Sequence, residues 1–275
     1  MWPVRRDLFH YFNNIAKYWK NGHEVLLTGP VGAGANSIAV DGSDVYVAGW
    51  GYKGNKTIAK YWKNGQSVEL SDGTNPAFAS GISVVDGNVY VVGSEGSAAR
   101  YWKNGEVVTL SENGSAFGIA VNGNNVFVAG EEMDAAVGGY ASYWTNGNKF
   151  SLMQSANRSQ ARFIALEGGH VYVAGFEEIY NGSSYVDSKG RYWKDGREVL
   201  LQGSAAVSSI AVFNGDVYVS GYYPKDASSG RKWDDVYLPR AHFSHQNASG
   251  ARYWVNGKAV TLPGTMATGV FLVPR

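Results

Sequence analysis

One aromatic phrase recurs six times along the chain, and it constrains the fold more than any other feature. The copies are AKYWKNG (16–22), AKYWKNG (59–65), ARYWKNG (99–105), ASYWTNG (141–147), GRYWKDG (190–196) and ARYWVNG (251–257). The Tyr-Trp pairs begin 43, 40, 42, 49 and 61 residues apart. Self-similarity with a period of this size is typical of a protein built from stacked structural repeats.

A second phrase alternates with the first: DVYVAG (44–49), NVYVVG (88–93), NVFVAG (125–130), HVYVAG (170–175) and DVYVSG (216–221). A short apolar segment such as SIAV (37–40) precedes each copy. Each unit therefore contains four short β-type segments. Asn-Gly and Asp-Gly turns, which tolerate positive φ, join the first segment to the second and the third to the fourth. Four antiparallel strands in about 40 residues indicate a propeller blade.

The blade count depends on the two ends of the chain. Five units are complete, residues 15–28 supply the third and fourth strands of another, and ATGVFLV (267–273) aligns with the first strand of the other units. We therefore expect an all-β, six-bladed β-propeller of four-stranded antiparallel blades, closed by N-terminal strands pairing with a C-terminal strand. Five blades with leftover ends is the alternative. Residues 1–271 form one domain in this interpretation, and LVPR (272–275) resembles a residual thrombin-cleavage tag.

These phrases resemble the bacterial YWxNG/VYVxG-repeat propellers, a group similar to the HAF-type extracellular repeat proteins. The resemblance covers nearly the whole chain and implies the propeller fold, but it implies no single activity. It suggests a secreted or periplasmic bacterial protein, although the N-terminus, MWPVRRDLFHYF, lacks the apolar stretch of a signal peptide.

Composition excludes several classes of partner. With 24 basic and 23 acidic residues the chain is nearly neutral, so electrostatic affinity for nucleic acid or an anionic membrane is not expected. The absence of cysteine excludes thiolate nucleophiles and Cys-ligated metals. We expect a monomer with no cofactor, no metal and a small-molecule or glycan ligand.

The repeated Tyr-Trp pairs allow two interpretations. They could be stacking platforms for sugars, or they could be buried between blades. The distance from each Tyr to the next apolar Leu is nine residues in every copy, as in Tyr18–Leu27 and Tyr253–Leu262. A buried aromatic ring removes about 150–250 Å² from water. We favour core packing for this phrase.

Loop length varies on one face alone. The first and second strands are always offset by seven residues, whereas the gap from the end of the second strand to the next Tyr is 12, 8, 13, 17 or 32 residues. In a meander the second-to-third and fourth-to-first connections emerge on the same side. Since function commonly lies on variable loops held by a rigid scaffold, we expect the binding site on this face.

Two groups of candidate residues lie there. Glu95, Glu132 and Glu177 occupy one column just after the second strand, flanked by Glu131 and Glu178. If they converge, they could be acid/base carboxylates of a glycoside hydrolase. Arg162 and Phe163 stand where other repeats carry mostly small residues, so Arg162 could clamp a ligand carboxylate or pair with Glu132 or Glu177. Candidate ligand-binding aromatics and imidazole complete the set: Trp50, Tyr222, Tyr223, Trp233 and His242.

We therefore expect a ligand-binding propeller for a carbohydrate or other polar ligand, with a glycoside hydrolase and a protein-interaction scaffold as alternatives. The motif HFSH (242–245) beside Asp234 and Asp235 offers metal-ligating groups, but H-x-x-H alone is not specific, and we predict no metal site.

Overall fold

The computed structural model describes residues 15–29, 32–136, 138–182, 184–203, 206–224, 248–263 and 269. Trp233, His242, the HFSH motif and the tail 272–275 lie outside the described residues, as do residues 267–273 apart from Gly269. The side chain of Tyr223 is also outside them.

The described chain consists of β-strands joined by turns and loops. They are β1 (Lys17–Lys20), β2 (His23–Leu26), β3 (Gly34–Asp41), β4 (Asp44–Lys53), β5 (Lys56–Lys63), β6 (Gln66–Glu69), β7 (Ala77–Val85), β8 (Asn88–Glu95), β9 (Ala98–Lys103), β10 (Glu106–Ser111), β11 (Gly114–Asn122), β12 (Asn125–Glu132), β13 (Tyr140–Thr145), β14 (Asn148–Ser151), β15 (Ser159–Glu167), β16 (His170–Asn181), β17 (Ser184–Lys194), β18 (Arg197–Leu200), β19 (Ala206–Phe213), β20 (Asp216–Pro224), β21 (Ala248–Val255) and β22 (Lys258–Thr261).

These strands form five four-stranded sheets, each in the order of the sequence, and one two-stranded sheet, β1–β2. Every pairing is antiparallel, for example in β15–β16, β16–β17 and β17–β18. The prediction of an all-β chain built from four-stranded antiparallel units is confirmed. The two-stranded sheet corresponds to the N-terminal half-unit.

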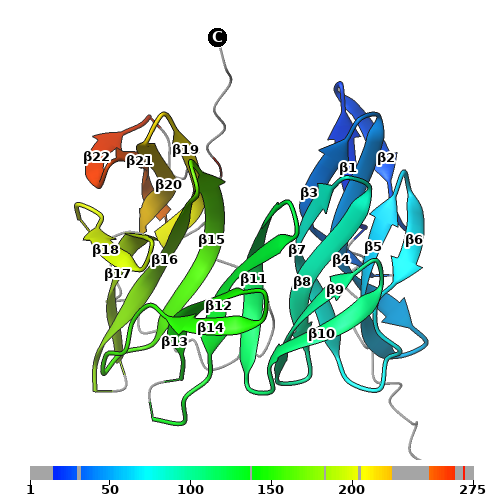
Figure 1. Ribbon diagram of the computed structural model, residues 1–275, viewed down its shortest axis with the longest axis horizontal. Helices are drawn as coiled ribbons and strands as arrows, with labels where there is room; N and C mark the ends of the chain where they lie inside the picture. The colour runs from blue at the N-terminus through cyan, green and yellow to red at the C-terminus, as the bar shows by residue number, and fades with distance from the viewer. Residues whose placement is uncertain are drawn as a thin grey trace, which may run out of the picture.

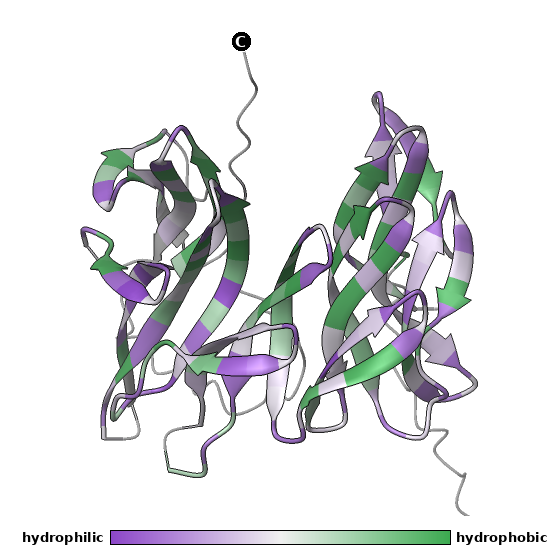
Figure 2. Cartoon of the chain, viewed as in Figure 1, coloured by the Kyte–Doolittle hydropathy of each residue, from purple (hydrophilic) through white to green (hydrophobic). Residues whose placement is uncertain are grey.

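Consecutive sheets lie against one another, and their first strands are neighbours in the order β3, β7, β11, β15 and β19 (Figure 1). Second strands such as β4 are buried along most of their length, whereas fourth strands such as β6 and β14 are exposed outer edges. First strands are partly exposed rather than covered on both sides as their apolar sequence suggests, because they lie at the inner edge of each sheet. Hydrophobic stretches run along inner strands such as β8 and β15 (Figure 2).

The Tyr-Trp phrase joins each sheet to both of its neighbours. Adjacent residues of a strand point to opposite faces, so Trp packs on the preceding sheet and Tyr on the following one. Trp102, for example, lies in the cluster of Tyr46 and Leu70 from the sheet before, while Tyr101 packs with Ala116 and Val126 from the sheet after. Five of the six Trp side chains, Trp62, Trp102, Trp144, Trp193 and Trp254, are at most 1% exposed. The core-packing interpretation is confirmed for them.

Two members of the aromatic series lack this packing. Trp19, in the two-stranded sheet, is 61% exposed. Tyr253, in the last sheet, is half-buried and belongs to none of the five hydrophobic clusters formed by the described residues. These are the residues that would face a preceding and a following sheet, respectively.

The Asn-Gly turn of the phrase has a second structural role. Asn146 and Gly147 have φ of 51° and 83°, as a two-residue type I′ hairpin requires. The Asn146 side chain also accepts a 2.9 Å hydrogen bond from the Val126 amide and donates one to Asn125. Asn64, Asn104, Asp195 and Asn256 bind the start of the second strand in the same way. The turn therefore ties the outer hairpin to the inner strands.

Asn146→Ala should lower the free energy of unfolding by about 2 kcal/mol, because alanine disfavours the left-handed conformation and cannot replace the hydrogen bonds. Urea unfolding monitored by tryptophan fluorescence measures the change. Asn146→Gly is the matched control. It keeps the backbone conformation and should lose only the side-chain bonds, so equal losses in both variants would contradict the conformational part of the argument.

Candidate functional site

A β-bulge interrupts the first strand of every complete sheet at the same position. The register shifts between Ala35 and Ser37 in β3, and the shift in β15 lies between Ala161 and Phe163. The extra residues are Asn36, Ser80, Phe117, Arg162 and Ser208. Bulges re-aim a side chain at the rim of a sheet. The column that contains Arg162 is therefore a structural feature of the repeat, and Arg162 is its charged member.

The variable connections lie at one end of the sheets. The β12–β13 connection and the β16–β17 turn are both at the lower end of the view, whereas the short β11–β12 and β15–β16 hairpins are at the upper end (Figure 1). The predicted single variable face is confirmed for these connections. The long insertion at 225–247 lies outside the described residues.

Glu131 is the centre of a buried network on this face. Its side chain is enclosed at the end of β12. Arg158 donates to it through Nε (3.2 Å to Oε2) and through Nη2 (3.0 Å to Oε1), and Gln160 Nε2 donates at 3.0 Å. The guanidinium and the carboxylate thus form a bidentate ion pair, which is the strongest geometry for such a pair.

The electrostatics of Arg158 reflect this pairing. Burial by itself lowers the pKa of Arg158, but the charge and hydrogen bonds of Glu131 outweigh it, and the net direction is upward. Arg158 Nη1 also lies 3.9 Å from Oε2 of Glu178, which accepts a 2.9 Å hydrogen bond from the Tyr180 hydroxyl. The network therefore spans β12, the segment before β15, and β16.

Arg162 lies beside this network, between two aromatic rings. Its guanidinium carbon is 4.7 Å from the ring centre of Phe117 and 5.6 Å from that of Phe176. Its Nε donates to Oε1 of Gln160 at 2.8 Å. Burial of the guanidinium lowers the pKa of Arg162 to about 10, with the Arg158 charge acting in the same direction and Glu131 and Glu178 opposing it. Arg162 stays charged at neutral pH, in an environment that disfavours the charge.

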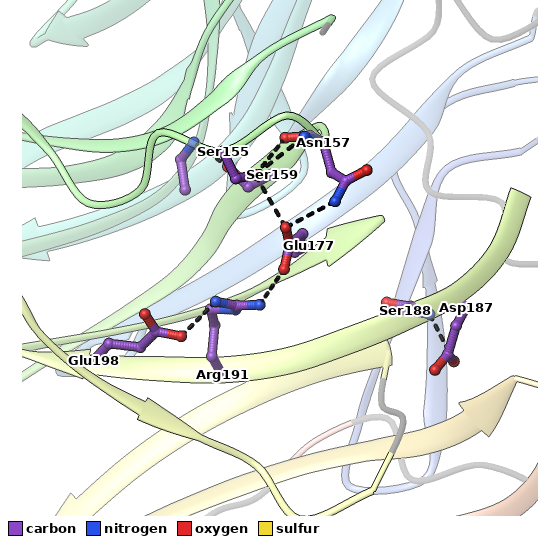
Figure 3. A network of polar contacts seen from close by, with 9 residues as sticks. Ser155, Asn157, Ser159, Glu177, Asp187, Ser188, Arg191 and Glu198 are labelled. Carbon is purple, nitrogen blue, oxygen red and sulfur yellow. Dashed lines mark hydrogen bonds and ion pairs between the residues drawn. The ribbon is translucent and has the colours of Figure 1, made fainter. Parts of the chain in front are cut away.

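Glu177 belongs to a separate network (Figure 3). Its Oε1 accepts hydrogen bonds from Ser155 Oγ (3.0 Å) and Asn157 Nδ2 (3.1 Å), and its Oε2 forms a close ion pair with Arg191. Arg191 is itself buried and also pairs with Glu198. The hydrogen bonds from Ser155 and Asn157 hold the loop that enters β15 against the sheet.

The other two carboxylates of the predicted column also have partners of their own. Glu132 accepts a hydrogen bond from Ser111 (3.0 Å) and lies 3.3 Å from Lys149 Nζ, and Glu95 lies 3.6 Å from Arg100 Nε. Among the described contacts no ion pair or hydrogen bond links any two of the three. Among the described contacts Glu132 pairs with Lys149 and Glu177 with Arg191, and neither carboxylate pairs with Arg162.

The remaining candidates lie in different surroundings. Phe163 packs with Tyr172 and Val217 in a hydrophobic cluster. Trp50 is buried against Tyr52 and Phe78, at 5.6 and 6.0 Å between ring centres. Tyr222 is buried and interacts electrostatically with Arg162. Arg162, Glu131, Glu178 and Tyr222 thus belong together, whereas the described contacts of Trp50 and Phe163 are with other groups.

Sequence reasoning identified Arg162 but missed Arg158 and Gln160, which stand just before it in SANRSQARF (155–163). The sequence signal that could have identified them is the spacing of Arg158, Gln160 and Arg162, which are each two residues apart. In an extended segment, residues two apart share a face, so all three could have been assigned to the side of Glu131.

Within the described ranges no group of three His, Asp or Glu side chains is arranged to hold a metal ion. The same residues contain no helix capable of spanning a membrane.

No protein-family model matches the sequence, and a search of curated proteins gave no match. Solved structures give weak similarities. A Mycobacterium tuberculosis puromycin-hydrolyzing peptidase has a TM-score of 0.45 and 16% identity over 69% of this chain, which spans only 36% of that protein. A thermostable family-43 glycoside hydrolase has a TM-score of 0.43 and 10% identity, and the match covers 86% of this chain and 96% of that one. The catalytic domain of a Coprinopsis cinerea GH62 α-L-arabinofuranosidase has a TM-score of 0.40 and 12% identity, and the match covers 74% of this chain and 88% of that domain. Values this low assign the chain to none of these families.

Proposed function

We propose that this protein is a ligand-binding β-propeller that takes a carbohydrate or another polar ligand on its variable face, at the site formed by Arg162, Glu131, Arg158 and Gln160. The observation that carries the proposal is the position of Arg162. A charged side chain occupies a bulge position that Asn, Ser or Phe fills in the other sheets, between two aromatic rings and beside a buried ion pair. Guanidinium, amide and carboxylate groups beside aromatic rings suit the hydroxyls and ring faces of sugars.

The surroundings of Arg162 disfavour its charge, which favours a functional role. A group whose folded-state pKa is about 10 instead of 12.5 is less stable in its charged form when the chain is folded. Residues that break local rules at a stability cost are concentrated at functional sites.

Arg162→Met should raise the free energy of unfolding by about 1 kcal/mol at pH 7, because an apolar side chain of similar length replaces a desolvated charge. The unfolded chain holds the Arg162 proton more tightly than the folded one, so the advantage of the variant should shrink as the pH rises through about 10. Urea unfolding at pH 7 and pH 10.5 measures both effects. A destabilised variant would contradict the argument.

The same variant tests the function. A glycan array probed with labelled wild-type protein should give binding that Arg162→Met loses. Lys149→Met is the control, since Lys149 pairs with Glu132 away from the Arg162 network. Equal glycan binding by wild type and Arg162→Met would refute the site.

A glycoside hydrolase is the second candidate. The observation in its favour is the accessibility of Glu132, whose side chain is 30% exposed against 19% for Glu95 and 9% for Glu177. In this alternative Glu132 acts with Glu177 or Glu95 as the catalytic pair. A panel of chromogenic glycosides should then show turnover that Glu132→Gln and either Glu177→Gln or Glu95→Gln abolish without abolishing binding. Turnover retained in Glu132→Gln would exclude this alternative.

We further propose that the fold closes into six blades. Trp19 lacks the preceding sheet that the other Trp side chains pack on, and Tyr253 lacks the following sheet that the other Tyr side chains pack on. If the first and last sheets were neighbours, each residue would gain the missing contact. Ile38 and Val40 on β3 are 53% and 64% exposed, whereas their counterparts in β7 are covered to a greater extent. Residues 267–273, which match a first strand in sequence, would cover Ile38 and Val40 and complete the N-terminal sheet.

If the ring closes in this way, Trp19→Ala should destabilise the protein by about 2 kcal/mol, since Trp19 would be buried against the last sheet. A five-bladed fold with loose ends leaves the side chain in water, and its loss would then cost less than about 0.5 kcal/mol. Chemical denaturation distinguishes the two values. Val107→Ala, at an exposed edge position, is the neutral control.

A further inference from the structure

Two of the complete sheets carry the same ion pair at their variable end. Glu95 pairs with Arg100 in one sheet and Glu177 pairs with Arg191 in another. The register is identical in both: each Arg lies opposite the Gly two residues before the Glu, Gly93 or Gly175. A carboxylate on the second strand and a cation on the third strand therefore meet diagonally on one face.

The first complete sheet has the cation without the carboxylate. Lys60 lies opposite Gly49 in β4 and β5, so Gly51 holds the position that Glu95 and Glu177 hold elsewhere. A Cβ atom placed on Gly51 would lie 3.0 Å from Cε and 3.1 Å from Nζ of Lys60. The ammonium group is thus aimed at the place where the missing side chain would begin.

Lys60 is only 9% exposed, although a buried ammonium group without a partner is costly. Among the described residues no side chain forms a hydrogen bond or an ion pair with its Nζ atom, and this atom is not among the fully enclosed polar atoms without a partner. Its tip therefore reaches solvent from a largely buried stem.

The nearest acidic candidate is otherwise engaged. Glu69 lies directly opposite Lys60 on β6, but its Oε2 accepts a 2.8 Å hydrogen bond from Lys53 at the exposed edge. An ion pair of Glu69 with Lys60 would compete with the Lys53 pair for the same carboxylate. Lys60 therefore carries a positive charge that no carboxylate of the described residues neutralises by an ion pair.

We propose that Lys60 and Gly51 form a second binding site on the variable face, where the carboxylate of a small-molecule ligand takes the place that a Glu side chain fills in two other sheets. The site lies on a different sheet from the Arg162 network and does not depend on the function proposed for it. Gly51 is buried beneath the end of the Lys60 side chain, so the ligand carboxylate meets the Lys60 ammonium group, and a shift of this flexible side chain opens the approach to the β4 backbone. An acidic sugar is one such ligand, so D-glucuronate is a suitable probe.

The experiment follows the Lys60 signal by NMR of protein with reductively ¹³C-methylated lysines, assigned with Lys60→Gln. Titration with D-glucuronate should shift this signal saturably, and D-glucose should leave it unchanged. Gly51→Glu supplies the carboxylate within the chain and should weaken D-glucuronate binding at least tenfold. Lys56→Gln is the matched control, since it removes an exposed charge from the same strand and leaves the Lys53–Glu69 pair in place, and it should bind as wild type does.

The alternatives have distinct outcomes. Loss of binding in Lys56→Gln as well would show an unspecific charge effect and overturn the site, and equal D-glucuronate affinity in wild type and Gly51→Glu would overturn it too. An unmoved Lys60 signal would overturn it too. Neither result touches the Arg162 site, whose glycan-array test uses other residues.

Discussion

Trp144→Ala should lower the free energy of unfolding by about 3–5 kcal/mol, the loss expected when a large aromatic side chain leaves a cavity in a packed core. Trp144 is completely buried and joins Tyr90, Val92 and Ala99 of the preceding sheet to its own sheet. The truncation therefore removes contacts from an interface between sheets, not only from one of them. Guanidinium unfolding and the midpoint of thermal unfolding measure the effect.

Phe150→Ala is a suitable comparison. Phe150 is aromatic and stacks on Tyr143 at 4.9 Å, but it lies on an outer edge strand and is substantially exposed. We expect a loss of about 1 kcal/mol. If both variants lost the same amount, burial between sheets would not be the source of the stability.

Arg191→Met should destabilise the protein by about 3–5 kcal/mol at pH 7, because it leaves Glu177 charged and buried without its cation. Chemical unfolding at pH 7 measures the loss, and a loss of less than about 1 kcal/mol, as for an exposed ion pair, would contradict the argument.

Glu198→Gln is the control for this variant. Glu198 also pairs with Arg191, but it is exposed, and exposed ion pairs contribute at most about 1 kcal/mol. The double variant Arg191→Met/Glu177→Gln should recover part of the stability. No recovery would mean that the unpaired charge is not what destabilises Arg191→Met.

The repeat architecture could be predicted because it is encoded locally. The Asn-Gly turns, the apolar second strands and the fixed interval from Tyr to Leu specify four antiparallel strands without knowledge of distant contacts. The opposite directions of Tyr and Trp follow from strand geometry once the strand is assigned. What the phrase alone did not show is that its Asn binds the second strand, because that bond joins residues 20 positions apart, as in Val126 and Asn146.

The candidate site was predictable only in part, for a related reason. Arg162 stood out because it breaks the repeat, Glu131 was noted because it flanks the carboxylate column, and the structure places both in one region. The column of Glu95, Glu132 and Glu177 was visible as a pattern, but its partners were not. Arg100 and Arg191 precede the Tyr-Trp pair within the repeat itself, so their cross-strand pairing with Glu95 and Glu177 depends on the register. Whether the three Glu side chains converge cannot be inferred from their positions in the repeat unless the register between the second and third strands is known.

The Tyr-Trp packing has a consequence for how such chains can change in number of units. Each sheet offers Trp on one side and Tyr on the other, so any copy can follow any other, as in head-to-tail assembly. Duplicating or deleting a unit would leave every junction chemically unchanged. The Tyr-Trp packing therefore does not determine how many sheets the chain contains. The spacing of neighbouring sheets is instead limited where crowding is greatest, at the first strands, where a methyl group on Gly118 would collide with the carbonyl of Arg162.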